Sequence, residues 1–404
     1  MKNVSDMDDY RADFPVLSNR DVIYLDSATS TLVPQQVIRA INQFYETNGA
    51  VIKRGTYRLT VEATELFQKA RAQIAEFFHV SSTEISFVPN ESYGITSLLY
   101  SLRWEKKNQI ITSLLEHHSN YLPILYLAKH FNLKIDYLTH TTEGQISHEV
   151  LNELITSDTK LISLTYSPLL FGTITPIKEI VKIAHEQNIP VLIDGTRIAG
   201  HRPINLKSLD CDFFVCHGNI GLMGPMGVGI LYINQDTEIE INPLILGSGT
   251  VSKVTTEDYK LMNYPDNFEP GSPNVANVVG LGAAIEYLKR IGLSNIQRQE
   301  KMLVELMIKE LRNVEKITLY GPLDASQKIG IVSFKVEELN AHDLAMYLDE
   351  VANIAVRSGL LCSHPMLDAF KIPGVVQASL HVYNTKEEVL QFLETVQTIV
   401  KELT

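Results

Sequence analysis

The stretch PVLIDGTRIAGHRPINLKSLDCDFFVCHGNIGLMGPMGVGILYIN, residues 190–234, decides the fold of this protein. It contains three short apolar runs, PVLIDG, DFFVCH and VGILYIN, each bounded by glycine or polar residues, as is typical of buried strands. Such runs alternate with helix-period segments between about residues 60 and 235, which predicts a mainly parallel sheet with helices on both faces. Ligands of such sheets bind beyond the carboxyl ends of the strands, so we expect Asp194 and the glycine-rich loop 216–229 at a functional site.

Four further runs, EISFV, QIITSLL, LKIDYL and LISLTYS, bring the predicted sheet to seven strands. Residues 275–313 have the pattern of two helices parted near Gly292, and the mixed strands and helices after them predict a smaller α+β domain. We therefore expect three parts, an N-terminal segment packing with the small domain, a large α/β domain and a small C-terminal domain, at 1–22, 23–290 and 291–404.

The composition is that of an ordinary globular protein, with 45% hydrophobic and 20% charged residues among 404. The net charge of −12, without runs of lysine or arginine, argues against nucleic acid or an anionic membrane as partner. We find no stretch of about 18 apolar residues that predicts a membrane span, and no apolar signal segment near the start. The three cysteines, Cys211, Cys216 and Cys362, have no metal-ligand spacing, which favours a cytoplasmic protein without a bound metal.

Ten short motifs, in this order, resemble the group II cysteine desulfurase and selenocysteine lyase branch of the class V aminotransferase family. They are RADFPVL, YLDSATSTLVP, KRGTYRLTVEATE, EHHSN, LIDGTR, LDCDFFV, GPMGVGILY, EPGSPN, VRSGLLCSHPML and ASLHVYNT. The resemblance runs nearly end to end. It implies the fold-type I architecture of enzymes that use pyridoxal phosphate (PLP), and a homodimer.

The residue that anchors PLP in that family is absent from the corresponding loop. The family uses a lysine there to form a Schiff base and to shuttle the substrate's α-proton. Here the loop reads His217-Gly218-Asn219-Ile220, and no lysine lies between Lys207 and Lys253. Isoleucine has neither a nucleophile nor a base, so we do not expect covalently bound PLP.

Other cofactor and substrate positions of the family also differ. The threonines that hold the phosphate correspond to Glu91 and Ser92, and a carboxylate beside a phosphate dianion is repulsive in a site of low dielectric constant. The arginine that grips the substrate carboxylate corresponds to Gln377, so a bidentate charged contact is lost. The family's asparagine, its glutamine or histidine, and its histidine pair correspond to Leu169, Arg197, Leu360 and Leu361.

Five positions keep the family's residue type. By resemblance, His117 stacks on the cofactor ring, Asp194 pairs with the ring nitrogen, and Ser272 contacts the phosphate across the dimer. Arg357 is retained before the cysteine loop, and Cys362 corresponds to the thiol that takes up sulfur as a persulfide. We take His117, Asp194 and Cys362 as the catalytic candidates.

Each candidate also has a purely structural interpretation. Asp194 is explained equally well as a strand-end or helix-capping carboxylate, and His117 as a hydrogen-bonded core histidine. Cys362 is explained as an unreactive thiol, although Arg357 and His364 in the same segment favour some thiolate character.

Three hypotheses of function follow. In the first, the protein does not use PLP, and its remodelled pocket binds another small molecule and supports a lysine-independent reaction. In the second, it is a non-catalytic persulfide carrier or partner subunit in sulfur metabolism, using Cys362 with a sulfur-acceptor protein or an active paralogue. In the third, it is a weak cysteine desulfurase or lyase that binds PLP without a covalent bond. The expected pocket residues are Glu91, Ser92, Leu169, Arg197, His217, Asn219, Ile220, Ser272, Arg357 and Gln377.

Overall fold

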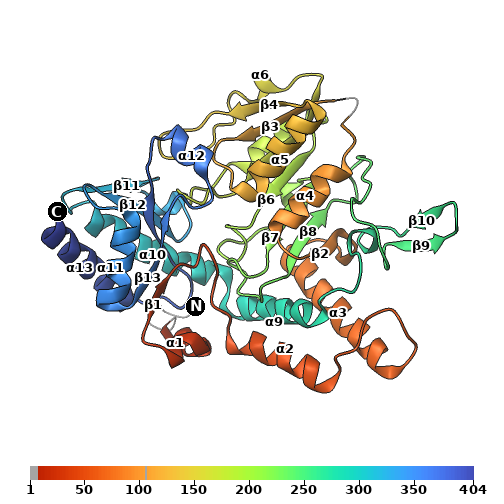
Figure 1. Cartoon of the computed structure of the whole chain (residues 1–404), viewed down its shortest axis with the longest axis horizontal. Helices are drawn as coiled ribbons and strands as arrows, with labels where there is room; N and C mark the ends of the chain where they lie inside the picture. The colour runs from red at the N-terminus through yellow and green to blue at the C-terminus, as the bar shows by residue number, and fades with distance from the viewer. Residues whose placement is uncertain (1–7, 105–106) are drawn as a thin grey trace.

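A seven-stranded sheet forms the centre of the larger part of the molecule in the computed structural model, which describes residues 8–104 and 107–404 (Figure 1). Its strand order is β2-β8-β7-β6-β5-β3-β4. All neighbours are parallel except β8, which runs antiparallel to β2 and β7. The predicted mainly parallel sheet of seven strands is therefore confirmed. The strands are β2 (Ile85–Val88), β3 (Gln109–Ser113), β4 (Lys134–Leu138), β5 (Thr159–Thr165), β6 (Val191–Asp194), β7 (Phe213–His217) and β8 (Gly229–Ile233).

Both faces of this sheet are buried, which explains why its strands read as continuous apolar runs. In β6, Leu192 belongs to one hydrophobic cluster and Ile193 to another, and Phe213 and Phe214 of β7 divide in the same way. Neighbouring residues of a strand point to opposite faces, so two covered faces require apolar residues at both. The helices of this part are α2 (Gln35–Thr47), α3 (Arg58–Phe77), α4 (Glu91–Ser101), α5 (His118–Phe131), α6 (Leu151–Leu154), α7 (Ile177–His185), α8 (Leu206–Leu209) and α9 (Val275–Ile291).

A second sheet of five strands, in the order β1-β13-β14-β12-β11, lies in the smaller part of the molecule (Figure 1). Gly292, with a φ of 85°, separates α9 from α10 near the predicted break. The strands are β1 (Ile23–Leu25), β11 (Ile317–Tyr320), β12 (Ile331–Val336), β13 (Ile354–Gly359) and β14 (Val375–Ser379). The helices are α10 (Leu293–Leu311), α11 (Ala341–Ala352), α12 (His364–Ala369) and α13 (Lys386–Leu403).

The N-terminal region joins the two parts. Residues 23–25, which we expected in the large domain, form β1 and pair in parallel with β13 of the small sheet. Before them, α1 (Pro15–Asn19) follows Phe14, whose ring contacts Tyr383 at 4.7 Å and Tyr287 of α9 at 6.1 Å. The segment therefore packs against both domains, because its aromatic side chain fills the space between them.

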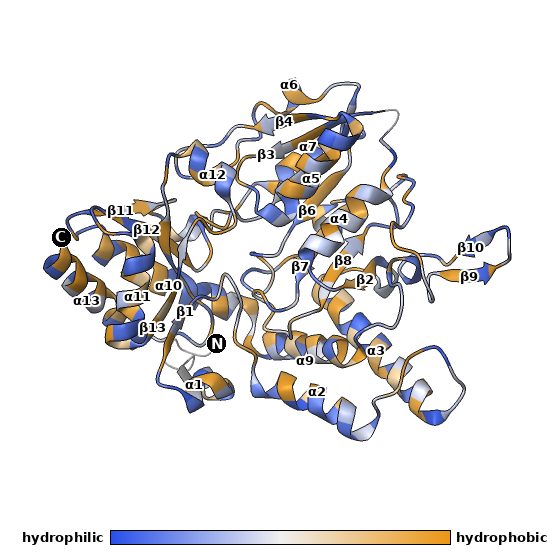
Figure 2. Cartoon of the chain, viewed as in Figure 1, coloured by the Kyte–Doolittle hydropathy of each residue, from blue (hydrophilic) through white to orange (hydrophobic). Residues whose placement is uncertain are grey.

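Apolar residues follow the central strands and α9 in Figure 2, in keeping with a core on both sides of the large sheet. The hairpin of β9 (Val251–Val254) and β10 (Tyr259–Leu261) projects away from the rest of the chain (Figures 1 and 2). Within the described residues, none of the helices combines the length and apolar character needed to cross a bilayer.

Candidate functional site

Polar side chains gather where β6 and β7 end, at the carboxyl edge of the large sheet. Asp194 is the last residue of β6, and His217 is the last residue of β7. Glu91 begins α4 and His117 caps the start of α5. Parallel strands bring their carboxyl ends to one edge, so residues far apart in the sequence meet there. Strand ends and helix starts thus build the predicted site.

Glu91 and His217 are in hydrogen-bond contact at this edge. Oε2 of Glu91 lies 2.9 Å from Nδ1 of His217, and Oε1 accepts a hydrogen bond from Oγ of Ser119 at 3.1 Å. Burial raises the pKa of Glu91, but the hydrogen bond with His217 and the charge of Arg197 outweigh it and bring the pKa to about 2. Glu91 is therefore a carboxylate at neutral pH.

His117 is neutral and its tautomer follows from its contacts. Its Nδ1 accepts the backbone N–H of Ser119 at 3.2 Å, as a helix cap does. Burial, followed by the charge of Arg197, lowers the pKa of His117 to about 3. A neutral ring that accepts at Nδ1 carries its proton on Nε2, so Nε2 is left as a donor. Ser92 extends the network, because its Oγ donates to Ser119 at 2.8 Å.

Asp194 and Arg197 lie on the same turn after β6. Oδ1 of Asp194 accepts the backbone N–H of Thr196 at 3.0 Å, which is the strand-end role considered above. Burial raises the pKa of Asp194. The guanidinium of Arg197 is buried and lies within electrostatic reach of four groups, which are Glu91, Asp194, Arg357 and the thiol of Cys362.

Several buried polar atoms around this point lack a hydrogen-bond partner among the described residues. These atoms are Nε and Nη1 of Arg197, Nε2 of His217, Oδ1 of Asn219, Oε1 of Gln377 and Oγ1 of Thr196. Buried polar groups in folded proteins are nearly always hydrogen-bonded, to protein or to water. Most of these atoms lie near the carboxyl edge of the large sheet, and Gln377 approaches from β14 of the small domain.

The loop after β7 buries Ile220, which is 4% exposed. Asn219 before it is held by the N-terminal region, since its carbonyl accepts the N–H of Thr31 at 2.8 Å and its amide donates to Ser30 at 3.0 Å. Gly221 after it has a φ of 72°, and a Cβ there would lie 2.0 Å from the carbonyl oxygen of Ala199. Only glycine fits this approach. The loop path is thus fixed on both sides of Ile220.

The small domain contributes Arg357 and Cys362. Nη2 of Arg357 lies 3.9 Å from Sγ of Cys362, and its Nη1 donates to Oγ1 of Thr29 at 2.9 Å. Cys362 is exposed, and its φ of 51° follows one of 52° at Leu361. His364, expected to support the thiol, instead has its Nδ1 2.8 Å from Nε2 of His118.

Gln377 and Leu169 join the small domain to the site. Nε2 of Gln377 donates to the carbonyl of Leu169 and to Oγ of Ser333, both at 2.9 Å. Gln377 also pairs with Arg357 in the register of β13 and β14. Both Gln377 and Leu169 are buried. The two positions therefore close the domain interface rather than present a charge to the site.

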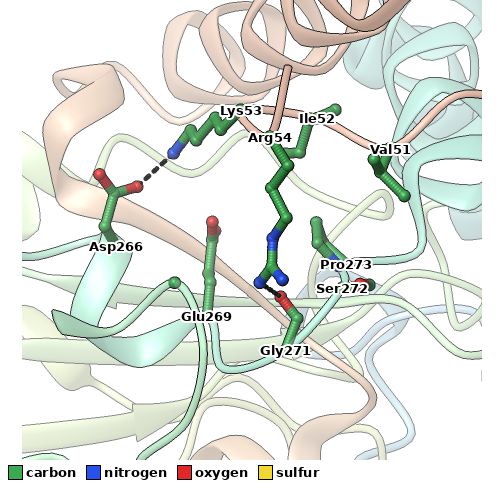
Figure 3. A pocket seen from close by; sticks show the side chains of 10 residues that line it. Val51, Ile52, Lys53, Arg54, Asp266, Glu269, Gly271, Ser272 and Pro273 are labelled. Atoms are coloured by element: carbon green, nitrogen blue, oxygen red, sulfur yellow. Dashed lines mark hydrogen bonds and ion pairs between the residues drawn. The ribbon is translucent and has the colours of Figure 1, made fainter.

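Ser272 lies in a different pocket of this chain, which Figure 3 shows from close by. Arg54 points across that pocket and donates to the carbonyl of Gly271 at 3.3 Å. Lys53 forms an ion pair with Asp266 at the other side. Ser272 is thus separate from the group around Asp194 within one chain.

Two residues of the site were missed by the sequence analysis, namely Asp26 and Ser119. Burial raises the pKa of Asp26, against the opposing effects of Thr29, Arg357 and Arg197. Asp26 accepts a hydrogen bond from Oγ1 of Thr29 at 2.6 Å. Both residues lie inside motifs already quoted, YLDSATSTLVP and EHHSN, so their polar character within those motifs was the available signal.

A buried histidine cluster next to the site is internally satisfied. His201, Glu300 and His381 bring three potential metal-ligating atoms within 4.8 Å of one another. However, Glu300 already binds His201 at 2.6 Å and Arg202 at 2.8 Å. His381 accepts the N–H of Val382 at 2.9 Å and lies 3.0 Å from the carbonyl of Gly221. The cluster therefore contacts the loop after β7 at Gly221.

Comparisons with known proteins agree with the resemblance found in the sequence. Residues 23–392 match the family described as Aminotransferase class-V. A probable cysteine desulfurase of Methanothermobacter thermautotrophicus is 35% identical over 395 residues, covering 97% of this chain and 98% of that protein. One from Pyrococcus abyssi is 36% identical over 398 residues, covering 98% of each. The apo structure of the cysteine desulfurase from Thermococcus onnurineus NA1 superposes with a TM-score of 0.94 at 35% identity, covering 100% of both chains.

Proposed function

The chain belongs to the class V aminotransferase family and is similar to cysteine desulfurases, and from this premise we propose that its site binds a small molecule other than PLP and acts without a lysine-bound cofactor. The contact between the carboxylate of Glu91 and the imidazole of His217 carries this proposal. The relatives' names favour an ordinary cysteine desulfurase, and that activity is the alternative which the experiment below separates.

The carboxylate of Glu91 argues against a phosphate group at the start of α4. A helix N-terminus attracts anions, and here the helix supplies its own, because Glu91 is its first residue. Its charge is retained at neutral pH, since its pKa is about 2. A phosphate dianion placed beside it meets a like charge in a partly desolvated site. The residues present do not fit the phosphate of PLP.

The loop after β7 argues against a covalent anchor. Ile220 occupies the position where the family resemblance places the lysine, and its side chain is buried. The sequence contains no lysine from 208 to 252. Asn219 and Gly221 fix the path of the loop on either side of Ile220, so a neighbouring residue cannot move into the position of Ile220.

The buried polar atoms without hydrogen-bond partners favour a site that binds a new ligand over a site that has lost its function. Burying polar groups without hydrogen-bond partners costs free energy. A pocket that no longer binds a ligand is therefore expected to be filled by apolar side chains. This edge keeps His217, Arg197 and Asn219 buried with unpartnered atoms. A bound polar molecule satisfies them.

Proton transfer is the chemistry that the two histidines support. A carboxylate at Nδ1 of His217 orients the ring and leaves Nε2 toward the unpartnered group of atoms. His117 is neutral with its proton on Nε2. Nε2 of His217 is therefore placed to accept a proton, and Nε2 of neutral His117 to donate a hydrogen bond to the bound molecule, without a lysine. Asp194, also a catalytic candidate, acts here by holding the turn that carries Arg197.

A second candidate function is persulfide uptake at Cys362. The exposed thiol, 3.9 Å from Nη2 of Arg357, supports it, because a sulfur donor can reach Sγ. In this role the partner is a sulfur-acceptor protein or an active paralogue. Mass spectrometry after exposure to a persulfide donor tests it, and an unmodified Cys362 contradicts it.

We also propose a cytoplasmic homodimer. The pocket of Ser272, Arg54 and Lys53 supports the dimer, since family resemblance places Ser272 at a partner's site and the pocket lies away from this chain's own site. All three cysteines are free thiols, in keeping with a reducing compartment. Light scattering on the purified protein measures the oligomeric state, and a monomer at micromolar concentration contradicts the dimer.

The absorbance spectrum of the full chain incubated with PLP and then dialysed tests the main proposal. We expect no visible band to remain and no sulfide to be released from cysteine. A retained band with sulfide release overturns the proposal in favour of a desulfurase. A retained band without sulfide release also overturns it, because PLP then occupies the site.

A further inference from the structure

Arg197 differs from the other fully buried arginines of the described chain in lacking an acidic partner. Arg71 contacts both carboxylate oxygens of Glu269, at 2.7 and 2.9 Å. Arg202 binds Glu300 at 2.8 Å and the carbonyl of Lys328 at 2.7 Å. Nε lacks a partner in all three arginines, so the difference lies at the outer nitrogens.

The guanidinium of Arg197 makes no ion pair with the described residues, and its Nη1 is buried without a hydrogen bond. The side chain is 8% exposed, so water has little access to it. A buried charge without a partner is strongly destabilising, and folded proteins keep one where a bound group completes it. The missing partner of Arg197 is therefore an anion that is not part of the chain.

The surroundings of Arg197 limit the charge of that anion. Arg357 adds a second positive charge within electrostatic reach, on the side of Cys362. Three acidic residues, Glu91, Asp194 and Asp26, also lie within electrostatic reach, and Glu91 is a carboxylate. Two cations favour an anion, while the nearby carboxylates repel a dianion more than a monoanion. A planar carboxylate also matches the planar guanidinium.

We propose that Arg197 anchors a small monocarboxylate ligand, held between the Cys362 thiol and the imidazole of His217. This inference rests on the proposed function and names its ligand class. The carboxylate fills the unpartnered side of the guanidinium, and the rest of the molecule faces Nε2 of His217, which is also unpartnered. Arg197 is on the large domain, in the turn after β6, and Cys362 is on the small domain, so the ligand lies between the two domains.

The test compares thermal unfolding of the full chain in the sodium salts of acetate, propionate and pyruvate with sodium chloride at equal ionic strength. Inorganic phosphate, sulfate and propionamide serve as further probes. We expect the melting temperature to rise with at least one carboxylate and not with propionamide. Arg197→Gln should weaken the binding of that carboxylate at least about tenfold, as measured by calorimetric titration. Arg103 is an exposed residue that pairs with Glu240, and Arg103→Gln should leave the binding of the carboxylate unchanged.

Unchanged carboxylate binding by Arg197→Gln overturns the proposal, as does a larger shift with phosphate or sulfate than with any carboxylate. A flat response to all carboxylates also overturns it. The ligand-free stability gives an independent readout. Arg197→Gln should lower the melting temperature less than Arg71→Gln, which strands Glu269 without its ion-pair partner. Equal losses in both variants show an internal partner for Arg197 and contradict the anchor.

The two proposals fail in different ways. A PLP band that survives dialysis contradicts the proposed function whatever the carboxylates do. A protein that stays colourless and does not bind carboxylates is consistent with the proposed function and contradicts only the carboxylate site at Arg197.

Discussion

Nδ1 of His217 and Oε2 of Glu91 lie 2.9 Å apart, and their contact joins the end of β7 to the start of α4. The pair places a fixed negative charge and an oriented imidazole at the carboxyl edge of the sheet. The contact with His217 and the charge of Arg197 keep Glu91 ionised, so we expect this carboxylate to affect both the stability and the ligand preference of this edge.

The pH dependence of stability reports the state of Glu91. Its pKa in the folded protein is about 2, below its ordinary value, so its stabilising effect is present above the unfolded pKa and is lost as pH falls toward 2. We expect Glu91→Gln to melt lower than the wild type near neutral pH, and the gap to narrow below about pH 4. Glu62→Gln, in an exposed pair with Arg58, is the matched control. A gap that is constant with pH contradicts the ionised pair.

Placing a lysine at 220 should not produce PLP binding. Ile220→Lys places an ammonium where the side chain is 4% exposed, so we expect a lower melting temperature. Glu91 still repels the phosphate, so the variant should stay colourless after incubation with PLP and dialysis. Ile220→Met, which is similar in length and uncharged, controls for the change of shape. A stable visible band in the lysine variant contradicts the proposed repulsion of the phosphate by Glu91.

Native alkylation should modify one of the three thiols. Cys362 is exposed, whereas Cys211 and Cys216 are buried, and burial raises the pKa of both. Mass spectrometry after brief iodoacetamide treatment should find the label on Cys362. Arg357→Gln should slow this labelling several-fold, because it removes the cation 3.9 Å from Sγ. An equal rate in the variant means that the guanidinium does not act on the thiol.

The turn after Ile220 should tolerate no side chain at Gly221. Its φ is 72°, and a Cβ would lie 2.0 Å from a backbone oxygen, so Gly221→Ala must shift the loop. We expect a loss of about 2 kcal/mol or more in the free energy of unfolding, measured with urea. Gly271→Ala, where the φ is 86° but nothing lies within 4 Å, isolates the backbone contribution. Similar losses of unfolding free energy in both variants show that the close approach to the carbonyl oxygen of Ala199 does not contribute to the effect at Gly221.

The seven strands and the break between α9 and α10 were predictable because each depends on residues that are neighbours in the sequence. Leu192 and Ile193 are both apolar because both faces of β6 are covered, and this pattern is visible in any short window. The position of β1 was not predictable, since three residues pair equally well with either sheet by pattern alone.

The sequence predicted the location of the site but not the contacts within it. The strand-end pattern placed Asp194 and the loop after β7 at one edge, and the family resemblance added Glu91 and Arg197. It did not indicate that Glu91 would pair with His217 and leave Arg197 without a carboxylate. Nor did it indicate that His364 would bind His118 instead of supporting Cys362. Burial patterns are encoded locally, whereas a side-chain partner depends on ångström-scale distances between loops of different strands, and only the folded chain sets those distances.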